Sequence, residues 1–240
     1  MGSDAVPASA SVSADWPSPN YGPRRDGAVP EIIVIHYTAM RSCESARTRL
    51  CLPEAEVSAH WLIGRDGSVE QLVPEEMRAW HAGLGSWQGL GDVNSRSIGI
   101  ELDNEGDRPF PEPLMASLEE LLPQIMRRWA IAPENVIGHS DFAPERKIDP
   151  GPRFDWQRLA RQGLAIWPER GTAAPAVDPE SFLALASSIG YPEAPLATIL
   201  PAFRLRFRPR HEGPLDAVDM ALVADLAMRF GADGGAWRSS

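Results

Sequence analysis

Three residues of this sequence could together bind one metal ion, and they lie in three different settings. His36 closes an apolar β-branched run, His139 follows a short apolar segment, and Asp149 comes soon after His139. Two imidazoles and one carboxylate form a ligand set that holds zinc and leaves a fourth position open for water. If the three converge in the fold, they form a hydrolytic metal site rather than a structural one. His60 and His81 could also coordinate a metal, and spacing alone excludes neither of them.

Two further residues could assist hydrolysis at such a site. Glu101 lies in the alternating segment 97–102, which predicts a strand with the carboxylate on the face opposite its apolar neighbours. From there it could take a proton from a metal-activated water. Lys147 and Asp149 project the same way if their segment is extended, and an ammonium group there could stabilise an oxyanion. The alternatives are a surface carboxylate on an edge strand and an exposed lysine.

The apolar patterning predicts the elements that must position these residues. Strands are expected at residues 31–37, 60–63, 68–72, 97–102 and 136–138, with an Asp-Gly hairpin turn between the second and the third. Helical spacing is found at 45–52, 112–130 and 155–162. Pro123 should kink the longest helix or lie near its start. Strands interspersed with helices predict an α/β domain over about residues 17–168.

A smaller unit is expected after a linker at residues 169–178, which is rich in small residues and proline. Helical spacing at 179–189, 195–207 and 215–230 predicts a three-helix domain over residues 179–233. Residues 1–16 are expected to form a flexible arm, and residues 234–240 a tail. Four alternating arginines are expected to form a solvated face: Arg204, Arg206, Arg208 and Arg210.

Composition excludes several classes of function. The formal net charge is −10, whereas binding of nucleic acid needs a basic surface. The sequence contains no apolar stretch of the roughly 18 residues that a membrane span requires. The N-terminus shows no signal peptide, which favours the cytoplasm; the alternative is a periplasmic protein whose signal was removed. Cys43 and Cys51 are expected to be reduced thiols, although they could pair.

Six short motifs follow one another in the first domain. They are VIHYTA at 34–39, VSAHWLI at 57–63, AWHAG at 79–83, SIGIE at 97–101, GHSD at 138–141 and RKIDPGP at 146–152. Together they strongly resemble zinc-dependent N-acetylmuramoyl-L-alanine amidases of the amidase_2 class, which share their fold with peptidoglycan recognition proteins. The resemblance covers about residues 17–168. It implies an α/β fold with a mixed central β-sheet flanked by helices.

The resemblance also implies specific roles for the residues named above. His36, His139 and Asp149 match the ligands of one zinc ion (Zn2+) per chain, Glu101 the catalytic glutamate and Lys147 the lysine that stabilises the transition state. The implied reaction hydrolyses the amide bond between the lactyl group of N-acetylmuramic acid, or its 1,6-anhydro form, and L-alanine. The implied partners are peptidoglycan fragments or muropeptides from cell-wall recycling or turnover. The protein is expected to be a monomer.

Residues around this centre are expected to contact the substrate. They are Tyr37, His60, Trp80, His81 and Asn94. Aromatic rings could stack on sugars, and polar groups could bond the peptide; the alternative is that Trp80 is core and Asn94 caps a turn. The C-terminal domain resembles a peptidoglycan-binding module more weakly, with Arg204 in place of a usual glutamine. Two other interpretations remain open here, a non-catalytic recognition module and a phage-type lysin.

Overall fold

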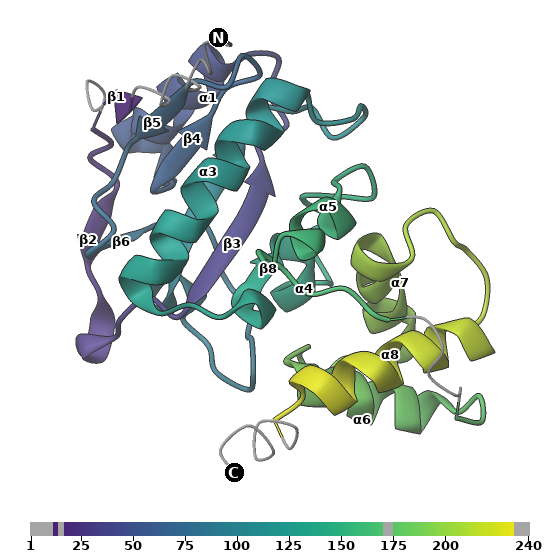
Figure 1. Cartoon of the computed structure of the whole chain (residues 1–240). Coiled ribbons are helices and arrows are strands. Elements are labelled where there is room, and N and C mark those ends of the chain that lie inside the picture. Colours follow the sequence, from purple (N-terminus) through teal and green to yellow (C-terminus); the bar gives the residue numbers. More distant parts are fainter. Residues whose placement is uncertain (1–11, 14–16, 170–174, 233–240) are drawn as a thin grey trace, which may run out of the picture.

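A mixed β-sheet forms the centre of the protein. The computed structural model describes residues 12–13, 17–169 and 175–232, and within them the main sheet has six strands (Figure 1). Their order is β1 (Val12–Ser13), β5 (Val69–Gln71), β4 (Trp61–Ile63), β7 (Ser97–Leu102), β3 (Ile32–Tyr37) and β8 (Val136–Gly138). Of the strand pairs described in this sheet, only β4–β5 is antiparallel. The mixed sheet and the hairpin are therefore confirmed.

Helices cover the main sheet, and a small second sheet lies beside it (Figure 1). The second sheet pairs β2 (Tyr21–Pro23) with β6 (Met77–Ala79) in antiparallel fashion. The described α-helices are α1 (Cys43–Cys51), α2 (Val93–Arg96), α3 (Glu112–Trp129), α4 (His139–Phe142), α5 (Trp156–Arg161), α6 (Pro179–Ile189), α7 (Leu196–Phe207) and α8 (Ala217–Phe230). Short 3-10 turns lie at Arg25–Gly27, Pro53–Ala55 and Pro133–Asn135.

Strand β3 is buried on both faces, which explains its continuous apolar sequence. Ile33 and Ile35 pack into the cluster that contains the apolar side of α3, whereas Ile32 and Val34 belong to a second cluster. Successive side chains of a strand alternate between its two faces. His36 therefore shares the face of Ile32 and Val34 and points away from α3.

The register between β3 and β7 places His36 directly beside Glu101. Paired residues of adjacent strands point to the same face, so Ser97 and Gly99 also lie on the face that carries His36. Strand β7 lies between β3 and β4 in the middle of the sheet. The alternative of a surface carboxylate on an edge strand is therefore wrong, because the position of Glu101 is internal.

The structure places Pro123 in the interior of helix α3, which excludes one of the two predicted alternatives. The helix begins at Glu112 and continues through Pro123 to Trp129, so the proline does not lie near its start. Its buried stripe is Leu114, Met115, Ser117, Leu118, Leu121, Leu122 and Ile125. An interior proline costs a helix about 3 kcal/mol. Burial of the apolar stripe against the sheet compensates for that cost.

The three C-terminal helices are found close to their predicted bounds, and they share a hydrophobic core with the sheet domain. Phe182, Phe203 and Phe207 belong to the same buried cluster as Trp87 and Phe142. In Figure 1 these helices lie at the end of the molecule that is near α4 and α5. The C-terminal helices thus pack against the part of the chain that carries His139.

Some expectations concern residues outside this description. Most of the predicted arm, the tail 234–240 and residues 170–174 of the predicted linker lie there, so the domain boundaries stay predictions. Within the described ranges, no helix has the length and apolar character needed to cross a membrane. Cys43 and Cys51 lie at the two ends of α1 as partly exposed thiols, as expected.

Candidate metal centre and active site

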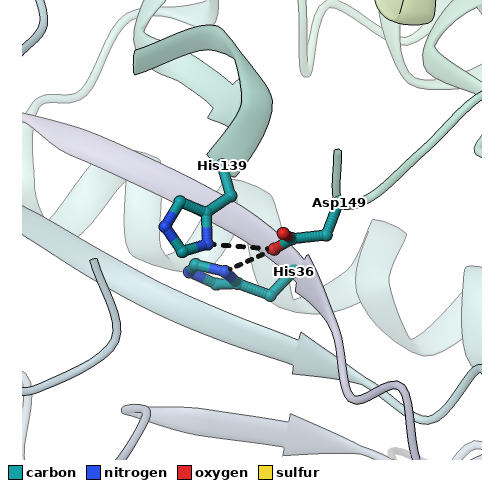
Figure 2. Close-up of side chains that lie close together, drawn as sticks. All are labelled: His36, His139 and Asp149. Atoms are coloured by element: carbon teal, nitrogen blue, oxygen red, sulfur yellow. Dashed lines mark hydrogen bonds and ion pairs between the residues drawn. The ribbon is translucent and has the colours of Figure 1, made fainter. Parts of the chain in front are cut away.

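The fold brings together the three ligands that the sequence predicted. His36 lies near the end of β3, His139 begins α4 directly after β8, and Asp149 lies in the following loop. Figure 2 shows both imidazoles directed at the Asp149 carboxylate. The Oδ2 atom of Asp149 is 2.8 Å from Nδ1 of His36 and 3.1 Å from Nδ1 of His139. All three side chains are buried.

The spacing of these atoms suits a tetrahedral metal ion. Ligand atoms that share a zinc at its usual bond lengths of about 2.0–2.1 Å are separated by roughly 3.3 Å. Both nitrogen–oxygen distances are close to that value, and the three ligand atoms lie within 4.8 Å of one another. Two nitrogens and one oxygen form a zinc-type donor set with space for a further ligand. The residues present therefore fit a zinc ion.

The protonation states also favour metal binding. Burial would raise the pKa of Asp149, but hydrogen bonds with His139 and His36 lower it well below its ordinary range. Burial lowers the pKa of His139 to about 4, although Asp149 opposes this effect. At neutral pH the pair is therefore a carboxylate and a neutral imidazole. Those are the forms that coordinate a metal without first releasing a proton.

Glu101 and Lys147 lie beside the three ligands in one pocket of about 430 Å³. The Oε2 atom of Glu101 is buried and has no hydrogen-bond partner among the described residues. Burial raises the pKa of Glu101 to about 7, against the opposing effects of His36 and Lys147. A bound divalent cation would lower this pKa again. Glu101 is therefore placed to accept a proton and later return it.

The five residues that were predicted to contact the substrate lie in two different places. Tyr37, Trp80 and His81 line the pocket. His60 and Asn94 are buried behind it and are not part of its described walls. His60 accepts a hydrogen bond from the backbone N–H of residue 99, and its other ring nitrogen is 3.0 Å from the carbonyl of residue 77. Asn94 accepts the backbone N–H groups of residues 81 and 82.

Sequence reasoning missed two cations of the pocket wall, Arg49 and Arg146. Arg49 is exposed on α1, and Arg146 precedes Lys147. The guanidinium of Arg146 donates to the carbonyls of Ala82 and Leu84. Proximity to Lys147 could have identified Arg146. Nothing in the sequence around Arg49 distinguishes it from a surface arginine.

The arginine series of the C-terminal domain is a correction. Arg204 and Arg206 were expected on a solvated face, but both are buried, with 5% and 2% exposure. Arg204 forms an ion pair with buried Asp219. Arg206 forms one with Asp141, at 2.9 Å between Nη1 and Oδ2. The expectation was wrong because each guanidinium finds a buried carboxylate that local sequence does not reveal.

Asp141 joins the C-terminal helices to α4, the short helix that begins at His139. Its carboxylate accepts hydrogen bonds from the Tyr191 hydroxyl at 2.6 Å, from Arg206, and from the Gly138 backbone N–H at 2.8 Å. The guanidinium of Arg206 also lies 4.4 Å from the centre of the Trp156 ring. The candidate ligand His139 therefore lies between Gly138 and Asp141, and C-terminal side chains fix Asp141 in place.

Replacing Arg206 should strongly destabilise the protein. We expect Arg206→Met to lower the free energy of unfolding by about 3–5 kcal/mol, because it leaves the Asp141 carboxylate buried without its cation. Arg210 is exposed and offers a matched control, Arg210→Met. Chemical denaturation of the two variants measures the effect. A loss for Arg206→Met below about 1 kcal/mol, the size of a surface ion pair, would contradict this interpretation.

Comparison with known proteins agrees with this geometry. Residues 26–152 match the N-acetylmuramoyl-L-alanine amidase family. The N-acetylmuramoyl-L-alanine amidase AmiD of Escherichia coli (strain K12) is 37% identical over 236 residues, covering 85% of this chain and 84% of AmiD. The 1,6-anhydro-N-acetylmuramyl-L-alanine amidase AmpD of Enterobacter cloacae is 36% identical over 160 residues, covering 60% of this chain and 86% of AmpD.

Solved structures show the same similarity. The complex of Escherichia coli AmiD with anhydro-N-acetylmuramic acid-L-Ala-D-γ-Glu-L-Lys superposes with a TM-score of 0.77 at 36% identity, covering 86% of this chain and 92% of that one. The complex of AmpDh3 from Pseudomonas aeruginosa with anhydromuramic pentapeptide has a TM-score of 0.76 at 29% identity, covering 88% and 94%.

Fold, ligand set and these similarities define the protein as an amide hydrolase with a candidate metal site. The chain belongs to the family of N-acetylmuramoyl-L-alanine amidases.

Proposed function

We propose that this amidase uses one zinc ion, held by His36, His139 and Asp149, to release the stem peptide from muropeptides. The bond cleaved is the amide between the lactyl group of N-acetylmuramic acid, or its 1,6-anhydro form, and L-alanine. The observation that carries the proposal is the convergence of two imidazoles and a carboxylate beside the unpartnered buried oxygen of Glu101. These four groups and Lys147 all come from one chain, which supports action as a monomer.

The roles of the residues follow from their positions. Zinc supplies Lewis-acid polarisation of the lactyl carbonyl and makes a water molecule easier to deprotonate. Glu101 accepts a proton from the water that attacks the carbonyl carbon, and the C–N bond then breaks. The same proton passes from Glu101 to the departing nitrogen of L-alanine. The ammonium group of Lys147 stabilises the negative charge that develops on the carbonyl oxygen.

The pocket walls support an anionic glycopeptide as the substrate. Tyr37 and Trp80 offer aromatic surface for a sugar or the lactyl group. Arg49 and Arg146 bring positive charge to the wall of the pocket in a protein whose net charge is −10. Stem peptides carry free carboxylates, and a guanidinium binds a carboxylate through paired hydrogen bonds. We therefore assign the carboxylates of the stem peptide to these two arginines.

Hydrolysis in isotopically labelled water tests the proposed reaction. The zinc-loaded protein is incubated in H2(18)O with anhydro-N-acetylmuramic acid-L-Ala-D-γ-Glu-L-Lys, and the products are identified by mass spectrometry. We expect an unlabelled tripeptide with a free L-alanine amine and an anhydromuramic acid with one heavy oxygen in its lactyl carboxylate. Cleavage at another bond, label in the tripeptide, or an intact substrate would refute the proposed function.

A further inference from the structure

Two consecutive residues, His81 and Ala82, lie directly behind the two histidine ligands. The Nδ1 atom of His81 is 3.0 Å from Nε2 of His36. The carbonyl oxygen of Ala82 is 3.0 Å from Nε2 of His139. Each ligand therefore has its Nε2 atom bound to this dipeptide, while its Nδ1 atom faces Asp149. Both ring nitrogens of His81 have partners within the protein, since Nε2 is 3.1 Å from Oγ of Ser97.

The hydrogen bonds behind His36 have one consistent direction. The Ser97 hydroxyl has a single proton, and its shorter contact, at 2.6 Å, is to the carbonyl of Val93, which can only accept. Ser97 Oγ therefore accepts from Nε2–H of His81. A neutral imidazole has one N–H, so Nδ1 of His81 is an acceptor. With a cation in the site, Nε2 of His36 would therefore carry the proton and Nδ1 would present its lone pair to the cation. Without a cation, Nδ1 faces the Asp149 carboxylate at 2.8 Å, and a carboxylate can only accept.

The hydrogen bond behind His139 has the same direction, and it goes directly to the backbone. A carbonyl oxygen only accepts, so in the 3.0 Å contact between Nε2 of His139 and Ala82 the imidazole is the donor. With a cation in the site, Nδ1 of His139 would then present its lone pair to that cation, beside Asp149. Outer contacts of this kind fix the orientation and tautomer of a metal-binding histidine. Here one dipeptide supplies that contact to both imidazoles.

The fold holds the dipeptide firmly. The Oδ1 atom of Asn94 accepts the backbone N–H groups of His81 at 3.0 Å and of Ala82 at 2.8 Å. The ring of His81 lies against Gly99 of β7, where a Cβ atom would come within 2.5 Å of it. Gly99 therefore provides the space that lets His81 reach His36. Asn94 fixes the backbone from which both contacts are made.

We propose that His81 is a positioning residue that holds the His36 imidazole in the orientation in which Nδ1 faces the metal position, with Ser97 anchoring His81. Asn94 belongs to the same assembly, because it fixes the 81–82 backbone. This inference rests on the proposed zinc function, and zinc affinity tests it separately from catalysis. A substrate contact by His81, expected from the sequence, would require one of its two internal hydrogen bonds to break.

Zinc affinity gives a readout that is separate from catalysis. Competition with a chromophoric chelator should show zinc binding to His81→Phe that is weaker by about 10–100-fold, the range found for lost outer contacts of metal ligands. His81→Asn, which places Oδ1 where Nδ1 was, should bind zinc nearly as well as the parent. Ser97→Ala, a smaller change that removes the anchor of His81, should also weaken zinc binding and serves if His81→Phe does not fold. Met228→Phe, an exposed change on α8, should bind zinc as the parent does. Parent-like affinity in His81→Phe would contradict the positioning role. Absence of zinc binding by the parent would instead refute the proposed function.

Discussion

Glu101→Gln is expected to lower kcat by about a thousandfold, within the range that general acid–base catalysis contributes. The substitution keeps the size of the side chain but removes its ability to accept a proton. Zinc binding should persist, because Glu101 is not one of the three ligands. Turnover of an anhydromuramyl tripeptide is measured by chromatography, and the zinc content of the same samples is determined.

A measurement of the free energy of unfolding should separate the loss of proton transfer from misfolding. Burial raises the pKa of Glu101 in the folded protein to about 7. Ionisation of this carboxylate therefore opposes folding as the pH rises, and the penalty is complete above about pH 7. The amide has no such penalty, and Oε2 forms no hydrogen bond that would be lost. In the metal-free protein, Glu101→Gln should therefore unfold no more easily than the parent. Glu145→Gln, an exposed change in the 143–149 loop, is the matched control and should leave turnover unchanged. Parent-like turnover in Glu101→Gln would exclude the proton-transfer role.

Asp149→Asn is expected to abolish both metal binding and activity. Asp149 contacts both histidine ligands and supplies the only carboxylate oxygen of the three-ligand cluster described here. Loss of an outer contact already weakens a metal site by about 10–100-fold, so loss of a ligand should weaken zinc binding by at least about 100-fold. Activity at limiting zinc should fall by at least the same factor as the zinc affinity. Isothermal titration with zinc measures the first effect and muropeptide turnover the second.

The matched control for this change is Asp107→Asn. Asp107 is largely exposed and pairs only with Arg108 in the described contacts. The Asp107→Asn variant should bind zinc and turn over substrate as the parent does. If Asp149→Asn retained parent-like zinc affinity, the ion would have to be held elsewhere and the assignment of the ligands would fail.

The parts of the fold that could be predicted from the sequence are those set by local pattern. Strand β3 is a β-branched run buried on both faces, and β7 alternates, so both were predicted within a residue or so. Parallel pairing of these two strands then brings His36 beside Glu101. His36 and His139 could be selected from all the histidines only because complete motifs surround them. Spacing alone left His60 and His81 as equal candidates.

What the sequence could not predict depends on contacts between distant segments. Arg206 read as a surface residue, because its partner Asp141 lies far away in the sequence, on α4. His81 and Asn94 read as substrate contacts, because the loop that contains them was expected to face the substrate. The sequence did not reveal that the backbone at 81–82 accepts and donates hydrogen bonds behind the predicted ligands. The cytoplasmic location remains a prediction.

A zinc titration of the metal-free protein tests the central claim most directly. Turnover of the anhydromuramyl tripeptide is measured while zinc is added stepwise, and bound metal is quantified in each sample. The proposed centre predicts no turnover without metal, a linear rise with added zinc and a plateau at one zinc per chain. Full turnover in protein shown to contain no metal would contradict it.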